Sequence, residues 1–283
     1  MDQKIDLLRK RLEEVETTEM EEKFFKAVTT KRWWLDGLNG KVKGKSADER
    51  KVIYIDEIKT IENAREEPEA FANIDCAMVR GEVWVPKDPS LYDYAIYYTA
   101  QLEKKKRFIH TIWPPHCLIG TEGHAVEDEI SKACDFWTKV TLKPVKYVYK
   151  GMNLLTENFS AIEAEVPILA DPTTQKNIEL LENLRSNCSN LIVVGQARSH
   201  CVRYTVEHIL DDWITNVWRN DKGQKIILPT NGSSCVAPPD APDLFKSPTK
   251  EFVEKIKKES NNRCVVDLSC NDVFNYIKGN QSS

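Results

Sequence analysis

A cysteine stands where this sequence could make a nucleophile. The stretch GQARSHCVRYTVEHIL (195–210) follows the apolar run NLIVVG (190–195) and has the pattern of an amphipathic helix that begins close to Cys201. The unpaired N–H groups of a helix N-terminus carry partial positive charge, which favours a thiolate, the nucleophilic form of cysteine, over a thiol. The alternative is a structural cysteine, because free cysteine also packs as a small hydrophobe.

Two other apolar runs end in residues that could act with such a thiolate. TIWPPHC carries His116, and YVYKG carries Lys150. A lysine ammonium stabilises a neighbouring thiolate, and histidine binds metals or moves protons. The alternatives are a solvated lysine at a strand end and a hydrogen-bonded histidine that orients its loop.

These residues need a scaffold that brings separate strand ends together. Apolar runs alternate with helical patterns in the C-terminal two-thirds of the chain, which is typical of a doubly wound, mostly parallel α/β sheet with helices on both faces. Functional groups of such sheets lie at the carboxyl ends of the strands. The predicted strands are 108–112, 146–150, 191–195, 225–229 and 264–268, and the predicted helices are 124–139, 173–186, 201–218, 248–259 and 271–278.

The first part of the chain has a different pattern. Apolar residues at positions 5, 8, 12 and 15 follow a heptad that is too short for a coiled coil, so we expect a docking helix there. Tyrosines between 92 and 98 predict a helix that packs in the core or at an interface. Either surface could support a homo-oligomer. We expect an atypical N-terminal region at 1–80 and an α/β domain at 81–283.

The composition argues against several classes of protein. The 283 residues have a formal net charge of -4, without the basic surface of a nucleic-acid-binding protein. No apolar stretch approaches the roughly 18 residues that a membrane span needs, and the charged N-terminus is unlike a signal peptide. The eight cysteines include no C-x-x-C pair. We therefore expect a cytoplasmic protein with free thiols.

Three segments, in order and at similar spacing, resemble the isochorismatase-like cysteine hydrolases, the family that includes nicotinamidases. WPPHCLIGTEGHA resembles the family's WPxHCxxGTxGA segment, YKGMNLLTENFSAI its lysine loop, and VVGQARSHCVRYT its nucleophile loop. The resemblance covers roughly residues 80 to 270 and implies the isochorismatase-like, Rossmann-like three-layer fold for the domain at 81–283.

The resemblance also implies the role of each motif residue. Cys201 would be the nucleophile and Lys150 its cationic neighbour. The backbone N–H groups of Ala197 and Cys201 would form an oxyanion hole, with a cis peptide bond between Gln196 and Ala197. The chemistry is consistent, because aimed amides stabilise the oxyanion that forms when a thiolate attacks an amide carbonyl.

His116 matches a position that binds a divalent metal in some nicotinamidases. Those sites also use an Asp-x-His pair earlier in the chain, and none of the five histidines here precedes His110. One ligand does not hold a metal such as zinc, so the ligand set is incomplete and no cofactor is assigned. The hydrogen-bonded histidine is the favoured interpretation of His116.

The family's acid/base is an aspartate that ends the first strand. KVIYIDEIKTI (51–61) offers Asp56 after an apolar run, 60 residues before His116. The alternative is a truncated or decayed copy that lacks the start of the family pattern. We favour this second alternative, because WWLDGLNGK resembles a later insertion of the family.

Three functions are compatible with these residues. The first is a nicotinamidase-like amidohydrolase that forms a thioester from a small carboxamide and releases ammonia. The second is a catalytically impaired or truncated family member that binds a small ligand or a partner. The third is a thiol sensor, which is disfavoured because no resolving cysteine lies near Cys201 in the sequence. We favour the first, with a small-molecule amide as substrate.

Overall fold

The computed structural model describes residues 34–36, 67–218, 223–238 and 241–281. The chain divides into two compact units, Met1–Tyr147 and Val148–Ser283. This division rests on how compactly the residues pack together. The predicted domains 1–80 and 81–283 rest on sequence resemblance, and these domain boundaries stay a prediction. Asp56 and the helix expected over residues 5–15 lie outside the described residues.

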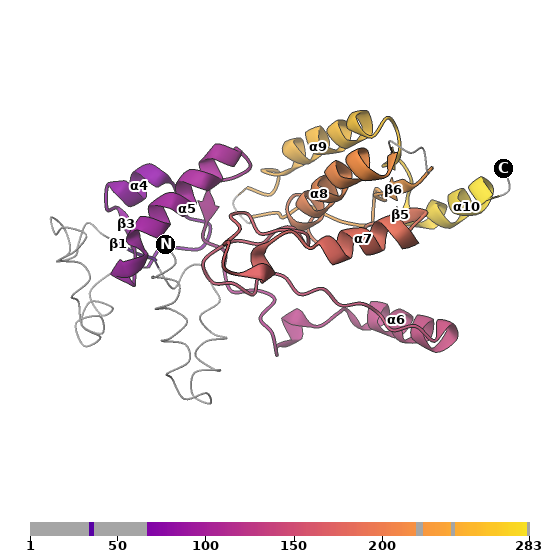
Figure 1. The fold of residues 1–283 in the computed structure, drawn as a ribbon, viewed down its shortest axis with the longest axis horizontal. Helices are drawn as coiled ribbons and strands as arrows, with labels where there is room; N and C mark the ends of the chain where they lie inside the picture. The colour runs from indigo at the N-terminus through magenta and orange to yellow at the C-terminus, as the bar shows by residue number, and fades with distance from the viewer. Residues whose placement is uncertain (1–33, 37–66, 219–222, 239–240, 282–283) are drawn as a thin grey trace. The chain divides into compact units, whose positions relative to one another are not determined.

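The first unit contains short antiparallel strand pairs and helices (Figure 1). Strand β1 (Trp34–Asp36) pairs with β3 (Trp84–Pro86), and β2 (Asn73–Ile74) pairs with β4 (His110–Thr111). The helices are α4 (Cys76–Arg80), the 3-10 turn η3 (Pro89–Leu91), α5 (Tyr92–Lys105), the 3-10 turn η4 (Glu122–His124) and α6 (Asp128–Thr141).

Local sequence accounts for the ends of these helices. Helix α4 begins after Asp75, whose carboxylate accepts a hydrogen bond from the N–H of Met78 and so satisfies a donor that the helix leaves open. Helix α5 ends at Lys106 in the left-handed conformation, φ 52°. A small apolar core of Ile74, Val79, Ala95 and Ile112 joins α4 and α5 to the pair β2–β4.

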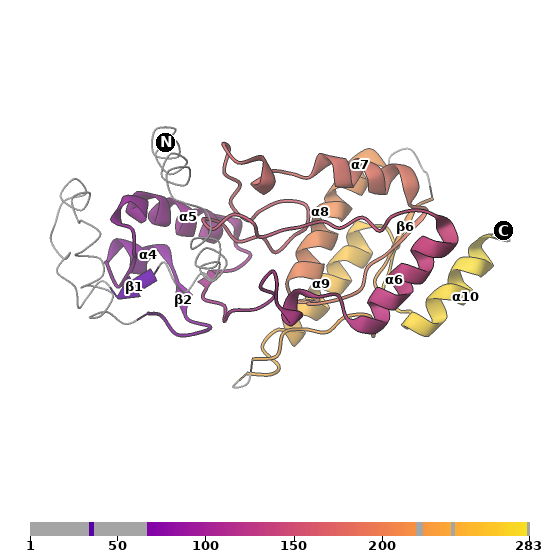
Figure 2. The ribbon, with the colours of Figure 1, turned by 90° about the horizontal axis from the view of Figure 1, so that it is seen from below.

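The second unit contains a parallel sheet in the order β5-β6-β7. Figures 1 and 2 show α8 lying between α7 and α9. The strands are β5 (Asn190–Ile192), β6 (Lys225–Ile227) and β7 (Cys264–Val265). The helices are the 3-10 turn η5 (Pro172–Thr174), α7 (Ile178–Asn187), α8 (Cys201–Asn216), α9 (Lys246–Glu259) and α10 (Cys270–Gln281).

Helix α8 is the centre of the core of this unit. Val202, Val206, Ile209, Leu210 and Trp213 recur at helical spacing, and all five are buried. They pack with apolar residues of α7, α9 and the sheet in one cluster. Because this cluster fixes α8 along much of its length, it also fixes the first turn of the helix, where Cys201 lies.

The structure confirms an α/β fold with a parallel sheet, and the doubly wound arrangement with helices on both faces stays a prediction. The strands predicted at 191–195, 225–229 and 264–268 correspond to β5, β6 and β7, and all five predicted helices are present. Within the described residues, no helix is both long enough and apolar enough to cross a membrane.

Two predicted strands are corrected. Residues 108–112 contribute β4, which pairs antiparallel with β2 and not with the parallel sheet. Residues 146–150 form no strand. The aromatic residues of this segment, Tyr147 and Tyr149, are 64% and 65% exposed and are not buried in a sheet. A strand also needs a neighbouring backbone to pair with, which a local pattern does not supply.

We predict that the Leu210→Ala substitution lowers the free energy of unfolding by about 2–5 kcal/mol, because it empties a buried site in α8. The matched change Leu169→Ala, at a residue 89% exposed, should alter it by less than about 0.5 kcal/mol. Urea unfolding followed by circular dichroism measures both. Equal losses in the two variants would contradict this core.

Candidate active site

Cys201 is the first residue of α8. The chain leaves the sheet at Gly195, whose φ of 107° is accessible to glycine without strain, and the bond between Gln196 and Ala197 is cis, as the resemblance led us to expect. His200 precedes the helix and makes no side-chain capping hydrogen bond. No side chain of the N-cap residue therefore covers the first amides of α8.

The N–H groups of Ala197 and Cys201 are the predicted donors of the oxyanion hole. Across the part of the chain that the structure describes, neither N–H donates a hydrogen bond. The carbonyl of Ala197 accepts hydrogen bonds from the N–H groups of His200 and Val202, at 3.0 and 3.1 Å. A turn fixed in this way, with two open donors beside a helix N-terminus, is able to bind an anionic oxygen. The oxyanion hole itself stays a prediction.

The structure brings Lys150 and Cys201 together. The Lys150 Nζ lies 3.5 Å from the Cys201 Sγ, and it also donates a hydrogen bond to the backbone oxygen of Asn158 at 2.8 Å. Gly151 directly after the lysine has a φ of 70°, a conformation that glycine adopts without strain. The ammonium is therefore held by the backbone of its own loop while it faces the sulfur.

The lysine loop is attached to the same helix that carries Cys201. The N–H of Ala161 donates to Thr205 Oγ1 at 3.0 Å, and Ser160 Oγ shares a hydrogen bond of 3.0 Å with His208 Nδ1. Thr205 and His208 follow Cys201 by four and seven residues, so all three share one face of α8. This spacing was visible in the sequence, but the sequence analysis did not identify Thr205 and His208.

Glu157, in the lysine loop, has a raised pKa. Burial, followed by the charge of Glu165, raises its pKa to about 8, and Lys150 acts in the opposite direction. The two glutamates are close, since the N–H of Glu165 donates to the Glu157 carbonyl at 2.8 Å. At neutral pH Glu157 therefore holds its proton and adds no negative charge beside Lys150.

His200 is adjacent to the nucleophile in sequence but is built into the packing. Its ring contacts Phe159 and Phe245, and its Nδ1 lies 2.8 Å from Ser199 Oγ. Burial, together with the charge of Arg203, lowers its pKa to about 4. His200 is thus neutral near pH 7 and supplies no positive charge to the sulfur.

His116 lies in the other compact unit, and its predicted place beside Cys201 stays a prediction. Its Nδ1 donates to the carbonyl of Pro114 at 2.7 Å, and its ring contacts Trp113 edge-on. Among the described residues there is no cluster of three or more histidine, cysteine, aspartate or glutamate side chains that could hold a metal. His116 with its described neighbours does not fit a metal site, so no step of the chemistry below passes through one.

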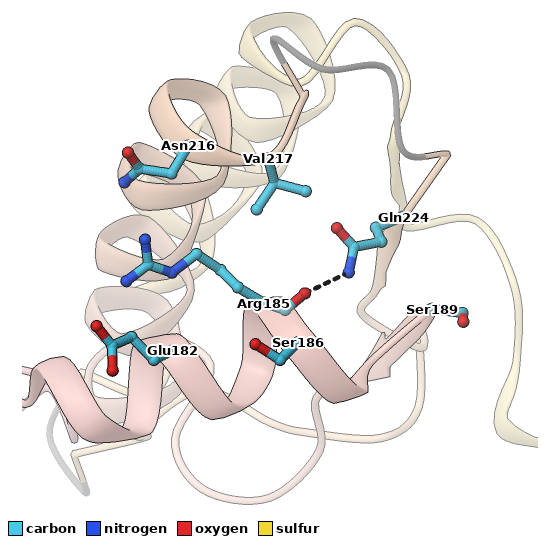
Figure 3. A pocket seen from close by; sticks show the side chains of 7 residues that line it. All are labelled: Glu182, Arg185, Ser186, Ser189, Asn216, Val217 and Gln224. Atoms are coloured by element: carbon cyan, nitrogen blue, oxygen red, sulfur yellow. Dashed lines mark hydrogen bonds between the residues drawn. The ribbon is translucent and has the colours of Figure 1, made fainter.

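A separate pocket lies at the other end of α8 (Figure 3). It has a volume of about 740 Å³ and is lined by residues that include Arg185, Asn216 and Gln224. Gln224 Nε2 donates to the carbonyl oxygen of Arg185 at 2.9 Å. Because Asn216 ends the helix that Cys201 begins, the pocket is roughly 22 Å from the thiol at 1.5 Å per residue. It is not part of the Cys201 site.

Comparison with solved structures finds nicotinamidases, the enzymes that the sequence motifs resemble. The yeast nicotinamidase bound to the inhibitor nicotinaldehyde matches with a TM-score of 0.39 and 18% identity, over 57% of this chain and 61% of that one. A nicotinamidase/pyrazinamidase of Acinetobacter baumanii matches with a TM-score of 0.36 and 16% identity, over 58% of this chain and 62% of that one. The chain spans about three fifths of the length of these enzymes. No family model and no curated protein matches the sequence.

We predict that stability falls as the pH rises from about 4.5 to about 8, because folded Glu157 keeps a proton that the unfolded chain loses. One such group contributes up to about 1.4 kcal/mol per pH unit. Urea unfolding at several pH values gives the free energy of unfolding as a function of pH. This free energy should fall less steeply with pH in Glu157→Gln than in the wild type, whereas Glu251→Gln, on the exposed side of α9, should behave as the wild type. The same dependence on pH in the wild type and in Glu157→Gln would refute the raised pKa of Glu157.

We predict that a limiting dose of iodoacetamide near pH 6.5 labels Cys201 ahead of the other seven cysteines. Cys117 and Cys270 are exposed while Cys201 is half-buried, so this preference would report activation and not access. The Lys150→Ala substitution should slow the labelling roughly tenfold, the factor that about 1.4 kcal/mol of lost attraction gives. Lys132→Ala on α6 is the control. Peptide mapping that finds Cys201 no faster than Cys117 would identify a packed structural thiol.

Proposed function

We propose that this protein is a cysteine-dependent amidohydrolase that acts on a small carboxamide, as nicotinamidases do. The observation that carries the proposal is the 3.5 Å approach of the Lys150 ammonium to the sulfur of Cys201 at the start of α8. Both the ammonium and the helix N-terminus stabilise a thiolate. A half-buried cysteine in the same turn as two open amides has the components for acyl transfer.

The reaction proceeds through two tetrahedral intermediates. The thiolate of Cys201 forms a bond to the amide carbon, and the carbonyl oxygen becomes an oxyanion at the N–H groups of Ala197 and Cys201. The C–N bond breaks, the nitrogen takes a proton and leaves as ammonia, and a thioester remains. Water then attacks the thioester, releases the carboxylic acid and restores the thiolate.

The proton for the leaving ammonia comes from a general acid/base. Asp56 is the candidate from the sequence, and it lies outside the described residues. Among the described groups near the sulfur, Lys150 is held by the carbonyl of Asn158 and serves as the fixed cation. We therefore assign Lys150 to thiolate stabilisation, and Asp56 stays a sequence-based candidate for proton transfer.

The test is the release of ammonia from nicotinamide and from a panel of other small carboxamides. We predict turnover by the wild type, loss of turnover in Cys201→Ala, and a decrease in kcat/KM of roughly a hundredfold in Lys150→Ala. Lys132→Ala should behave as the wild type. Labelling of Cys201 without ammonia release from any amide would contradict the proposal and favour a family member that binds its ligand without turnover.

A further inference from the structure

The loop that carries the predicted oxyanion hole, residues 195–201, is hydrogen-bonded to the loop of residues 229–234. The side chain of Arg198 makes two of these hydrogen bonds. Residues 229–234 follow β6, the strand next to β5 in the parallel sheet. The N–H of Gly195 donates to the carbonyl of Gly232 at 2.9 Å, so the two loops are joined where the nucleophile loop leaves the sheet. A Cβ at Gly232 would lie 2.8 Å from a methyl group of Val194, which shows how closely the loops approach.

Ser234 holds both neighbours of Ala197. Its Oγ donates to Gln196 Oε1 at 2.9 Å, and its carbonyl accepts the N–H of Arg198 at 2.7 Å. The peptide that presents the N–H of Ala197 is therefore fixed from both sides by one residue of the other loop. An oxyanion hole depends on donors that are already in place when charge develops.

Arg198 completes the attachment with its side chain. Its Nε donates to Ser233 Oγ at 2.9 Å, and its Nη2 donates to the carbonyl of Pro229. The guanidinium is thus bonded to the 229–234 loop, whereas the Cys201 sulfur is approached by Lys150. An arginine that directs its donors into a neighbouring loop can fix a backbone without touching a reacting atom.

We propose that Arg198 is a positioning residue that aligns the oxyanion-hole amide of Ala197 by clamping the nucleophile loop to residues 229–234. The inference rests on the proposed function, because it assumes that Cys201 acylates through an oxyanion. It assigns Arg198 no contact with the substrate. Its removal should therefore impair a reaction that builds an oxyanion and spare one that does not.

Two reagents separate these effects without any amide turnover. 4-Nitrophenyl acetate acylates Cys201 when the thiolate adds to the ester carbonyl and 4-nitrophenolate leaves, so an oxyanion forms on the way. Iodoacetamide alkylates the same thiolate by displacing iodide from a saturated carbon, so no oxyanion forms. The rate constant of acylation divided by that of alkylation therefore measures how well the oxyanion is stabilised. The alkylation rate alone measures the reactivity of the Cys201 sulfur.

We expect Arg198→Met to lower the acylation rate about tenfold or more while the alkylation rate changes less than about twofold. Arg198→Lys, which keeps one donor for Ser233 or Pro229, should recover part of the ratio, and Ser233→Ala should shift it in the same direction by less. Arg80→Met, on an exposed arginine of α4, is the matched control. The Ser233→Ala variant maintains the test if Arg198→Met does not fold.

If Arg198→Met changes the acylation and alkylation rates equally, or changes neither, the proposed positioning role of Arg198 is wrong. A wild-type ratio no higher than that of free cysteine would overturn it as well, since no oxyanion hole would then exist to be positioned. Failure of the proposed function is separate, because it appears as a lack of ammonia release while the ratio of the two rates still responds to Arg198.

Discussion

An ammonium group that stabilises a thiolate must be held in place by something other than the thiolate itself. In this chain the carbonyl of Asn158 holds Lys150, and Gly151 directly after the lysine adopts a positive φ. The lysine loop is in turn attached to α8 through Thr205 and His208, on the face that begins with Cys201. The 3.5 Å approach of nitrogen to sulfur is therefore a property of one helix and the loop bound to it.

The parallel sheet supplies the second half of the site. Neighbouring parallel strands end at the same edge, so the loops after β5 and β6 meet there. The loop after β5 carries Ala197, and the loop after β6 carries Ser234, which binds the residues on both sides of it. Lys150 and the loop after β6 thus contact different parts of the same turn.

The sequence predicts the helix, the strand and the motif residues of the candidate site better than the contacts that hold them in place. Helix α8 and the strand before it follow from their apolar patterns, and the motif resemblance indicated Lys150 and the cis bond before Ala197. The clamp by Arg198 was not predicted, since its partners lie some thirty residues away on another strand end. The lowered pKa of His200 comes from burial and from the charge of Arg203. Tertiary packing, and not local sequence, brings Phe159 and Phe245 against its ring.

The most direct measurement is a crystal structure of the protein soaked with a small aromatic aldehyde, because a thiolate adds to an aldehyde carbon and leaves an anionic oxygen. The account predicts continuous density from the Cys201 Sγ to the aldehyde carbon, with the oxygen at about 3 Å from the backbone nitrogens of Ala197 and Cys201 and the Lys150 ammonium beside the sulfur. An unmodified Cys201, or an adduct whose oxygen points to solvent, would contradict it.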